Sequence, residues 1–128
     1  MALINEPNEI LYRKIHSKQF EEYSKKVSSS AFIDRKGCSV NKLAGRNENE
    51  IINYYENKWE IPYKMKAIVN ITVQECLDIS VYPIDDNSNK PNHHFHTEIH
   101  DSACKIEISK IKARLLAKKV KIVKIYYS

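Results

Sequence analysis

Residues 66–79, KAIVNITVQECLDI, carry the clearest structural pattern in the chain. Apolar side chains alternate over residues 66–73, and the two-residue period of a β-strand places them on one face of a sheet. Thr72 and Glu75 have the spacing of a capping box, so a short helix should follow the strand. Residues 80–84 then return to a strand pattern. This stretch alone predicts a β-sheet with a helix attached.

Further strands and helices are expected on both sides of this stretch. β-favouring or alternating residues predict strands over residues 9–15, 28–33, 38–43, 93–100 and 120–126. Apolar spacing predicts helices over residues 17–27, 50–58 and 101–115. Turn-forming residues predict surface loops over residues 34–37 and 85–92. The expected fold class is therefore α+β, a small single domain over residues 1–128 with a mixed β-sheet and two to four helices, and with no fixed structure over residues 1–8.

Two of the expected helices depend on a stripe of apolar side chains. In the first, Ser17 is the expected N-cap, and Phe20, Tyr23 and Val27 share one face. In the second, Asp101 or the next residue is the expected cap. Its expected core-facing stripe consists of Cys104, Ile108, Ile111 and Leu115.

The composition is typical of a folded domain. Hydrophobic residues make up 42% and charged residues 29% of the 128 residues, which is close to the average for globular proteins. No stretch approaches the roughly 20 apolar residues of a membrane span, and the N-terminal residues lack the layout of a signal peptide. We therefore expect a cytoplasmic protein without membrane contact. Three widely spaced cysteines indicate reduced thiols, and the enrichment in Asn, Ile and Lys is typical of AT-rich bacterial genomes.

Positive charge is concentrated at the C-terminal end. Residues 105–128 hold seven Lys and one Arg against one Glu, whereas the net charge of the whole chain is +5. Such a patch attracts nucleic acid or an acidic protein surface. The alternative is a lysine-rich face that only keeps a helix and an edge strand in solution. The candidate partner-binding residues are Lys110, Arg114, Lys118, Lys119 and Lys121.

Four of the five histidines lie between His93 and His100, in the sequence HHFHTEIH. In a strand, His94, His96, Glu98 and His100 would share one face, and imidazole and carboxylate groups suit zinc or another divalent metal. His96 and Glu98 are also candidate catalytic residues, because an imidazole titrates near neutral pH and can act as a general acid or base. Alternate strand residues lie roughly 6.5 to 7 Å apart, too far for tight chelation. The alternative is therefore a solvated strand face with no cofactor.

Three segments, LYRKIHSKQF, SSSAFIDRKGCSV, and KAIVNITVQECLDISVYPIDDN followed by HFHTEI, occur in this order along most of the chain. Together they resemble a group of short bacterial hypothetical proteins with no assigned activity. In that group a single histidine follows the loop, and it corresponds to His96 here. His93, His94 and His100 depart from that pattern. The resemblance implies the domain boundaries and His96 as the residue to test, and it implies no reaction type.

Two functions agree with these patterns. The first, which we favour, is an accessory or interaction domain that binds an acidic partner, nucleic acid or protein, through its basic C-terminal helix and strand. The second is a small histidine-dependent nuclease or phosphoesterase, such as a toxin or defence component, in which His96 and Glu98 activate water. Because the chain has only Gly37 and Gly45, a glycine-rich phosphate loop is excluded.

Overall fold

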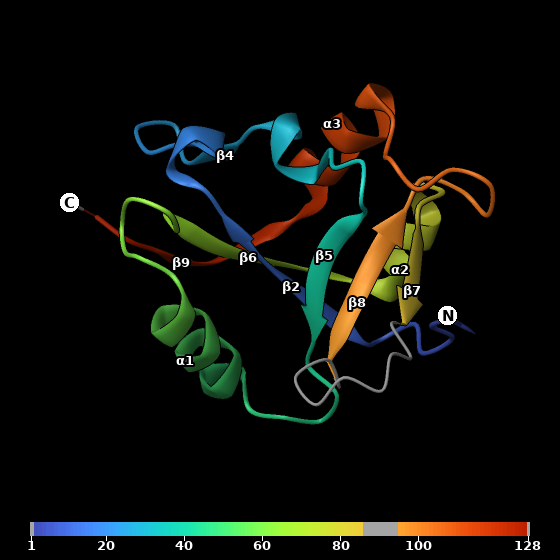
Figure 1. Ribbon diagram of the computed structural model, residues 1–128, viewed down its shortest axis with the longest axis horizontal. Coiled ribbons are helices and arrows are strands. Elements are labelled where there is room, and N and C mark those ends of the chain that lie inside the picture. Colours follow the sequence, from blue (N-terminus) through green and yellow to red (C-terminus); the bar gives the residue numbers. More distant parts are fainter. Residues whose placement is uncertain (1, 86–94, 128) are drawn as a thin grey trace.

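The computed structural model describes residues 2–85 and 95–127 and has the α+β architecture that the sequence predicts (Figure 1). The strands are β1 (Ala2–Leu3), β2 (Ile10–Ile15), β3 (Phe20–Glu21), β4 (Lys26–Val27), β5 (Cys38–Lys42), β6 (Ala67–Thr72), β7 (Tyr82–Asp85), β8 (His96–His100) and β9 (Lys121–Ile125). The helices are α1 (Glu48–Lys58), α2 (Val73–Asp78) and α3 (Lys110–Lys119), and the 3-10 turns are η1 (Ser17–Gln19) and η2 (Ser29–Phe32).

Within residues 2–85 and 95–127, seven strands form one sheet in the order β1-β7-β8-β5-β2-β6-β9. Its ladders among the described residues are all antiparallel, which refines the expected mixed sheet. The longest ladder joins β2 to β6, from Ile10↔Thr72 to Ile15↔Ala67. This ladder confirms the strands expected over residues 9–15 and 66–73. β3 and β4 form a separate hairpin.

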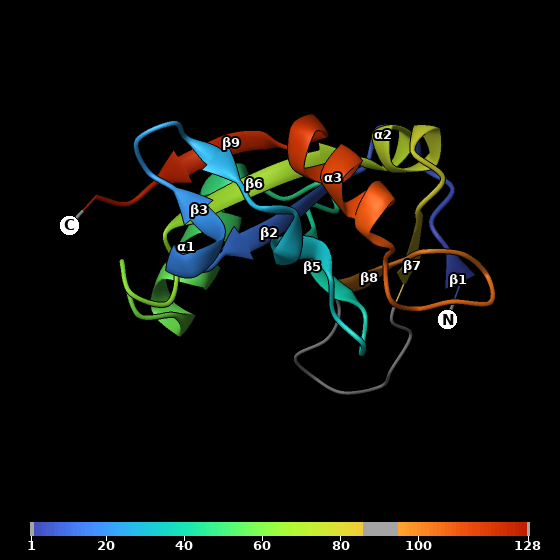
Figure 2. The same ribbon diagram turned by 90° about the horizontal axis from the view of Figure 1, so that it is seen from above.

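Side chains of the sheet pack into two cores on its opposite faces. Leu11 of β2 belongs to a core with α3 and η2, whereas the neighbouring Tyr12 belongs to a core with α1. Figures 1 and 2 show α1 and α3 on opposite sides of β2. The Tyr55 hydroxyl donates to the Tyr12 carbonyl oxygen at 3.0 Å, and the Tyr12 hydroxyl donates to Glu48 Oε2 at 2.6 Å. These bonds fix α1 against β2.

Several local predictions are confirmed. The capping box of Thr72 and Glu75 is present at the start of α2. β9 is the edge strand expected near the C-terminal end, and it pairs with β6.

At the N-terminal end of the chain, Ala2–Leu3 pair with β7, although the sequence indicates no fixed structure over residues 1–8. Most of the loop expected over residues 85–92 lies outside the described residues.

Residues 17–27 form a hairpin, so the helix predicted there is wrong. After the single turn η1, Phe20 pairs with Val27 across the β3–β4 hairpin. Tyr23 is 99% exposed at its tip, although the helical spacing predicted a buried position. Lys25 has a φ of 56°, which lies in the left-handed region and cannot continue a right-handed helix. Cross-strand pairing therefore overrides the helical spacing.

Two further predictions need correction. The strand expected over residues 28–33 is wrong, because Ser28 caps η2. The helix expected from Asp101 is also wrong in its start, because Ser109 is the N-cap of α3. Of the predicted apolar stripe, Ile108 is buried. The exposed members of that stripe are Cys104, Ile111 and Leu115.

Candidate functional site

A cleft lies beside α1, and three neighbouring strands place polar side chains in it. The sheet register pairs Tyr12 of β2 with Asn41 of β5, and Asn41 with His96 of β8. Paired residues of adjacent strands lie on the same face, so His96 lies on the side of the sheet that carries α1. Its neighbour Thr97 and, two residues further, Ile99 are buried on the other side.

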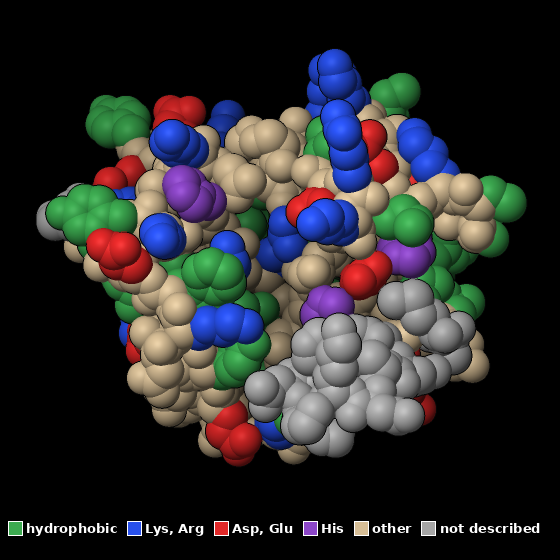
Figure 3. Space-filling view, in the orientation of Figure 1, with side chains coloured by type: hydrophobic (Ala, Val, Ile, Leu, Met, Phe, Trp, Pro, Cys, Tyr) green, Lys and Arg blue, Asp and Glu red, His purple; other side chains and the backbone are tan. Residues whose placement is uncertain are grey.

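The cleft has a volume of about 410 Å³ and is open to solvent. Figure 3 shows a hollow near the middle of this face, with lysine or arginine side chains (blue) and a histidine (purple) beside it. Among its described lining residues there is no aspartate or glutamate. We call it the α1 cleft, lined mainly by Arg13, Lys14, Ser39, Asn41, Tyr54, Lys58, Trp59 and His96.

Arg13 lines the α1 cleft just beyond the point where β2 and β5 stop pairing. The β2–β5 ladder contains two residue pairs, both before Arg13 in the sequence. Beyond them the guanidinium makes the bonds: Nη1 donates to the Ser39 carbonyl oxygen at 2.6 Å, and Nε and Nη2 donate to the Ala31 carbonyl oxygen at 2.9 and 2.6 Å. Arg13 therefore holds β5 and η2 in place while it adds a positive charge to the cleft.

Two lysines bring further positive charge to the cleft. Lys14 Nζ lies 3.7 Å from the centroid of the Trp59 ring, a cation–π contact. Lys58 Nζ donates to the Tyr54 hydroxyl at 3.0 Å. Burial, reinforced by the charges of Arg13 and Lys58, lowers the pKa of Lys14 below its ordinary value. In the described part of the chain, neither lysine forms an ion pair with a carboxylate.

His96 lies in the α1 cleft next to a hydroxyl group. Its Nε2 is 3.2 Å from Ser39 Oγ, and the tautomer of the ring decides which of the two donates. A hydroxyl beside an imidazole is the arrangement of a nucleophile and its general base. The residue that sequence reasoning selected is therefore placed in a polar, cationic cleft.

Glu98 and His100 bond to each other outside the lining of the α1 cleft. His100 Nε2 lies 2.9 Å from Glu98 Oε1. The Glu98 carboxylate packs against Gly37, where an added Cβ would lie 2.5 Å from Oε1. The catalytic pair expected from the sequence is thus divided, with His96 in the cleft and Glu98 beside it.

The candidate metal ligands are only partly placed. His94 lies outside the described residues, so the predicted set of His94, His96, Glu98 and His100 stays a prediction. Within residues 2–85 and 95–127, no three His, Cys, Asp or Glu side chains are grouped closely enough to hold a metal ion.

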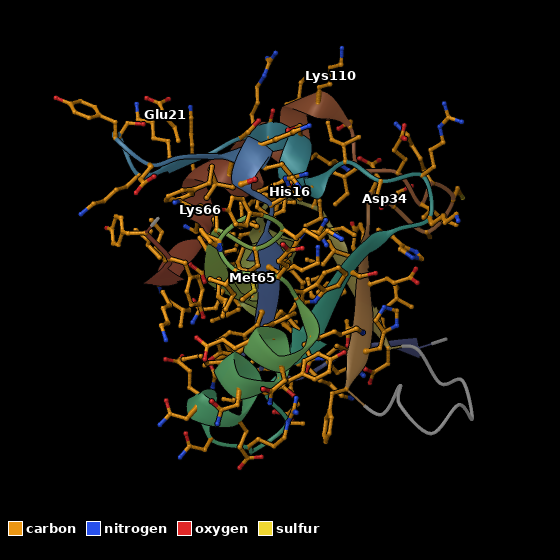
Figure 4. All side chains as sticks on the ribbon, turned by 60° about the vertical axis from the view of Figure 1, so that its left-hand side comes forward. His16, Glu21, Asp34, Met65, Lys66 and Lys110 are labelled. Atoms are coloured by element: carbon orange, nitrogen blue, oxygen red, sulfur yellow. The ribbon has the colours of Figure 1, made fainter. Side chains whose placement is uncertain are left out.

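The five predicted partner-binding cations lie on a different surface. Lys110, Arg114, Lys118 and Lys119 are exposed on α3, and Lys121 is exposed on β9. Because residues four apart are neighbours on a helix, the first three form one row. Figure 4 shows Lys110 at the opposite end of the molecule from α1. We call these five residues the basic α3 face.

A groove of about 520 Å³ lies between α3 and the β3–β4 hairpin. Lys25 and Lys26 line it from the hairpin, and Arg114 and Lys118 line it from α3. The rest of this lining is mainly aliphatic, formed by Val27, Ala117, Val120 and Ile122. We call it the α3–β4 groove. Sequence reasoning missed the two hairpin lysines because it assigned them to a helix.

Sequence reasoning also missed most of the α1 cleft. The sequence predicts only that Lys14 lies in a strand, and Lys58 and Trp59 lie at the C-terminal end of α1. The available signal was the sequence YYENKW at residues 54–59, which combines aromatic rings with a lysine. That signal does not reveal which strand faces it.

No family model matches the chain, and comparisons with curated proteins and with solved structures gave no significant match. In the described part of the chain, no helix is long and apolar enough to cross a membrane. The molecule is thus defined by its geometry, as a small α+β domain with a cationic cleft on one side of its sheet and a basic groove on the other.

Proposed function

We propose that the protein is an interaction domain whose basic α3 face and α3–β4 groove bind an acidic, amphipathic segment of a partner protein. The observation that carries the proposal is the presence of unpaired cations and exposed aliphatic side chains on one surface. Lys25 and Lys26 stand across the groove from Arg114 and Lys118. Among the described residues, none of these four forms an ion pair with a carboxylate.

The aliphatic component extends onto the outer side of α3. Ile111 is 70% exposed and Leu115 is 44% exposed. At 100° per residue these two side chains form a row beside the row of Lys110, Arg114 and Lys118. The basic row therefore lies between an aliphatic ridge and a groove with aliphatic lining. This alternation suits a helix or strand that carries acidic and apolar residues on one face.

The same alternation favours a protein over nucleic acid as the partner. Protein interfaces combine an apolar centre with a polar rim, whereas nucleic-acid interfaces are more polar and contact mainly phosphates. Exposed Ile111 and Leu115 would contribute nothing to phosphate binding. No aromatic side chain is among the described residues that line the groove, so base stacking has no support there.

The test measures binding of three fluorescent probes at two salt concentrations. The probes are an amphipathic peptide with Glu and Leu at helical spacing, a polyglutamate of equal charge, and a single-stranded oligonucleotide. We expect the amphipathic peptide to bind most tightly. Replacing Lys110, Arg114 and Lys118 with Gln should weaken its binding and reduce the salt dependence, because fewer charges are paired. Leu115→Ser should weaken binding at both salt concentrations alike.

The matched control replaces Arg35, Lys36 and Lys64 with Gln, which removes the same charge from exposed positions elsewhere. This control should bind the peptide like wild type. Tighter binding of the oligonucleotide, with no effect of Leu115→Ser, would replace the protein partner with nucleic acid. If the control and test variants lost the same amount of binding affinity, the basic α3 face would only keep the protein in solution.

A second candidate function concerns the α1 cleft. The contact of 3.2 Å between His96 Nε2 and Ser39 Oγ, in a cleft with cationic lining, favours hydrolysis of a phosphoester with His96 as general base. Cations near a phosphate stabilise the charge that develops in the transition state. Glu98 and His100, which bond to each other outside the cleft lining, take no part in this step.

The test is hydrolysis of single-stranded RNA and DNA, with divalent metal and with a chelator. His96→Ala should lower the rate by about two to four orders of magnitude, the usual contribution of a general acid or base. His100→Gln is the control, since His100 lies outside the cleft lining. Failure of the wild-type protein to cleave either substrate would remove this second function.

A further inference from the structure

The α1 cleft gathers positive charge that the described chain does not neutralise. Lys14 Nζ and Lys58 Nζ lie 3.7 and 5.8 Å from the centroid of the same Trp59 ring. Arg13 adds a third charge, and its guanidinium is fixed by bonds to the Ala31 and Ser39 carbonyl oxygens. Like charges held near one another repel, so an anion that enters between them is stabilised.

The burial of Lys14 also favours binding of an anion in the α1 cleft. Burial and two like charges lower its pKa, which means that the folded protein disfavours the charged form of this lysine. A lysine that served only to solubilise the surface would be expected to point into water, where its charge is unopposed. Lys14 instead packs over an indole ring inside a cleft. An anionic ligand would offset both the burial and the repulsion.

The rest of the lining identifies the class of ligand. Tyr54 is 38% exposed and, with Trp59, offers aromatic surface for a planar ring. Arg46 Nη2 donates to Asn41 Oδ1 at 2.7 Å, which leaves the Asn41 amide nitrogen to donate to a ligand. The volume of about 410 Å³ falls in the range of roughly 300 to 1,000 Å³ that is typical of small-molecule sites.

We propose that the α1 cleft binds a phosphorylated nucleoside, with its phosphate held by Lys14 and Lys58 and its base packed against Tyr54 and Trp59. Lysines bind phosphate as point charges, and aromatic rings stack with bases of any sequence. The ligand is either a free nucleotide or the phosphorylated end of a nucleic-acid strand. This inference concerns binding only, so it depends neither on catalysis by His96 nor on the basic α3 face.

The experiment uses the intrinsic fluorescence of Trp59, which is the single tryptophan of the chain and lines the cleft. AMP, adenosine, inorganic phosphate and a 5′-phosphorylated oligonucleotide are titrated into the full-length protein. We expect a saturable change with AMP. Adenosine and phosphate, which each lack one half of the ligand, should bind at least about tenfold more weakly. Tighter binding of the oligonucleotide than of AMP would identify a strand end as the ligand.

Two variants test the assignment of the phosphate contacts. Lys58→Gln should weaken AMP binding about tenfold, as expected for one charged contact, whereas Lys64→Gln removes an exposed charge outside the cleft lining and should bind like wild type. Lys14→Met should weaken AMP binding while its midpoint of urea unfolding stays equal to or above that of wild type. That combination distinguishes a binding residue from a structural one.

Several results would overturn the proposal. One is the absence of any saturable change with AMP, GMP, CMP or UMP at millimolar concentration. Another is displacement of AMP by phosphate at equal concentration, which would mean a simple anion site. A third is unchanged binding by Lys58→Gln. The variant of the basic α3 face with Lys110, Arg114 and Lys118 replaced by Gln should bind AMP normally, so the two proposals can fail separately.

Discussion

Replacing Asp101 with Asn should destabilise the protein, because this carboxylate connects the end of β8 to the start of α3. Asp101 is buried, and its Oδ1 accepts a hydrogen bond from the Ser109 amide at 2.9 Å. Lys112 Nζ lies 3.5 Å from Asp101 Oδ2 and donates to the Asp101 carbonyl oxygen at 2.8 Å. Since Ser109 is the N-cap of α3, the position of the helix depends on this carboxylate.

The expected loss is about 1.5 kcal/mol. Asn keeps an oxygen that can accept from Ser109, so the change converts a charge-assisted bond into a neutral one, which costs about 1 kcal/mol. The lost attraction to the partly exposed Lys112 adds about 0.5 kcal/mol. With an unfolding entropy of about 2.1 cal/mol/K per residue, a chain of 128 residues should unfold about 5 to 6 °C lower.

The loss should depend on pH in a defined direction. Burial opposes ionisation of Asp101, but the bond from Ser109 and the charge of Lys112 outweigh it and hold the pKa of this carboxyl below its usual range. A lowered native pKa stabilises the folded state at pH values above the unfolded pKa of about 3.9. That stabilisation is lost as the pH falls through the native pKa. The difference between wild type and Asp101→Asn should therefore be full at neutral pH and shrink in acid.

The assay is urea unfolding at pH 7 and in acid, followed by far-ultraviolet circular dichroism. Asp78→Asn is the control, because it makes the same charge change at an exposed position at the end of α2. Equal stability of Asp101→Asn and Asp78→Asn at pH 7 would refute the assigned role of Asp101. So would a difference that stays constant as the pH is lowered.

Two further predictions follow from the packing. Gly37→Ala should destabilise more than Gly45→Ala by about 1 kcal/mol, measured by urea unfolding. Both glycines have a positive φ, but a Cβ at Gly37 would lie 2.5 Å from Glu98 Oε1 and displace this oxygen from its bond to His100, whereas a Cβ at Gly45 meets nothing within 4 Å. Equal losses would contradict this packing of Glu98. With a thiol reagent at pH 8, the exposed Cys104 should react first. Cys38 and Cys76 should react only on unfolding, because burial blocks access to their thiols and raises their pKa. A fast phase that persists in Cys104→Ser would show that a buried thiol is accessible.

Local sequence signals were sufficient where neighbouring residues alone determine the structure. The alternation before Thr72 and the capping box with Glu75 gave β6 and α2 correctly. Both depend on interactions within a few residues. The strand β2 was also found, because its β-branched and aromatic residues leave few alternatives. These elements hold Arg13 and the floor of the α1 cleft.

The wrong predictions concern segments whose sequence fits two structures equally well. There, contacts with residues far away in the sequence determine which structure forms. Helix α3 has two apolar rows, one with Ile111 and Leu115 and one with Ala113 and Leu116. The first is larger and was expected in the core, yet the second is fully buried. The small Ala113 permits close approach of η2, whose Phe32 belongs to the same core. The apolar spacing within α3 therefore could not predict which face of the helix packs against η2.

The α1 cleft also depends on contacts between elements that are far apart in the sequence. Its cations come from β2 and from the end of α1, and they meet because Tyr12 and Tyr55 bond α1 to β2. His96 was recognisable from sequence as a member of a histidine cluster, but its neighbours Ser39 and Asn41 come from a strand on which no functional signal was visible. A cleft whose lining comes from three strands and a helix has no local sequence signature.

Arg13 links the two sides of the sheet. On the α3 side its guanidinium bonds to the carbonyl oxygen of Ala31 in η2, and toward the α1 cleft it bonds to the carbonyl oxygen of Ser39. These two oxygens need donors at fixed angles, because the β2–β5 ladder has ended before them. A lysine has a single nitrogen and could not supply the forked set of N–H groups that arginine holds in one plane. Arg13 thus lines the α1 cleft and also supports η2, whose Phe32 belongs to the same core as Ala113 and Leu116 of α3. A side chain with several fixed donors is what this position requires.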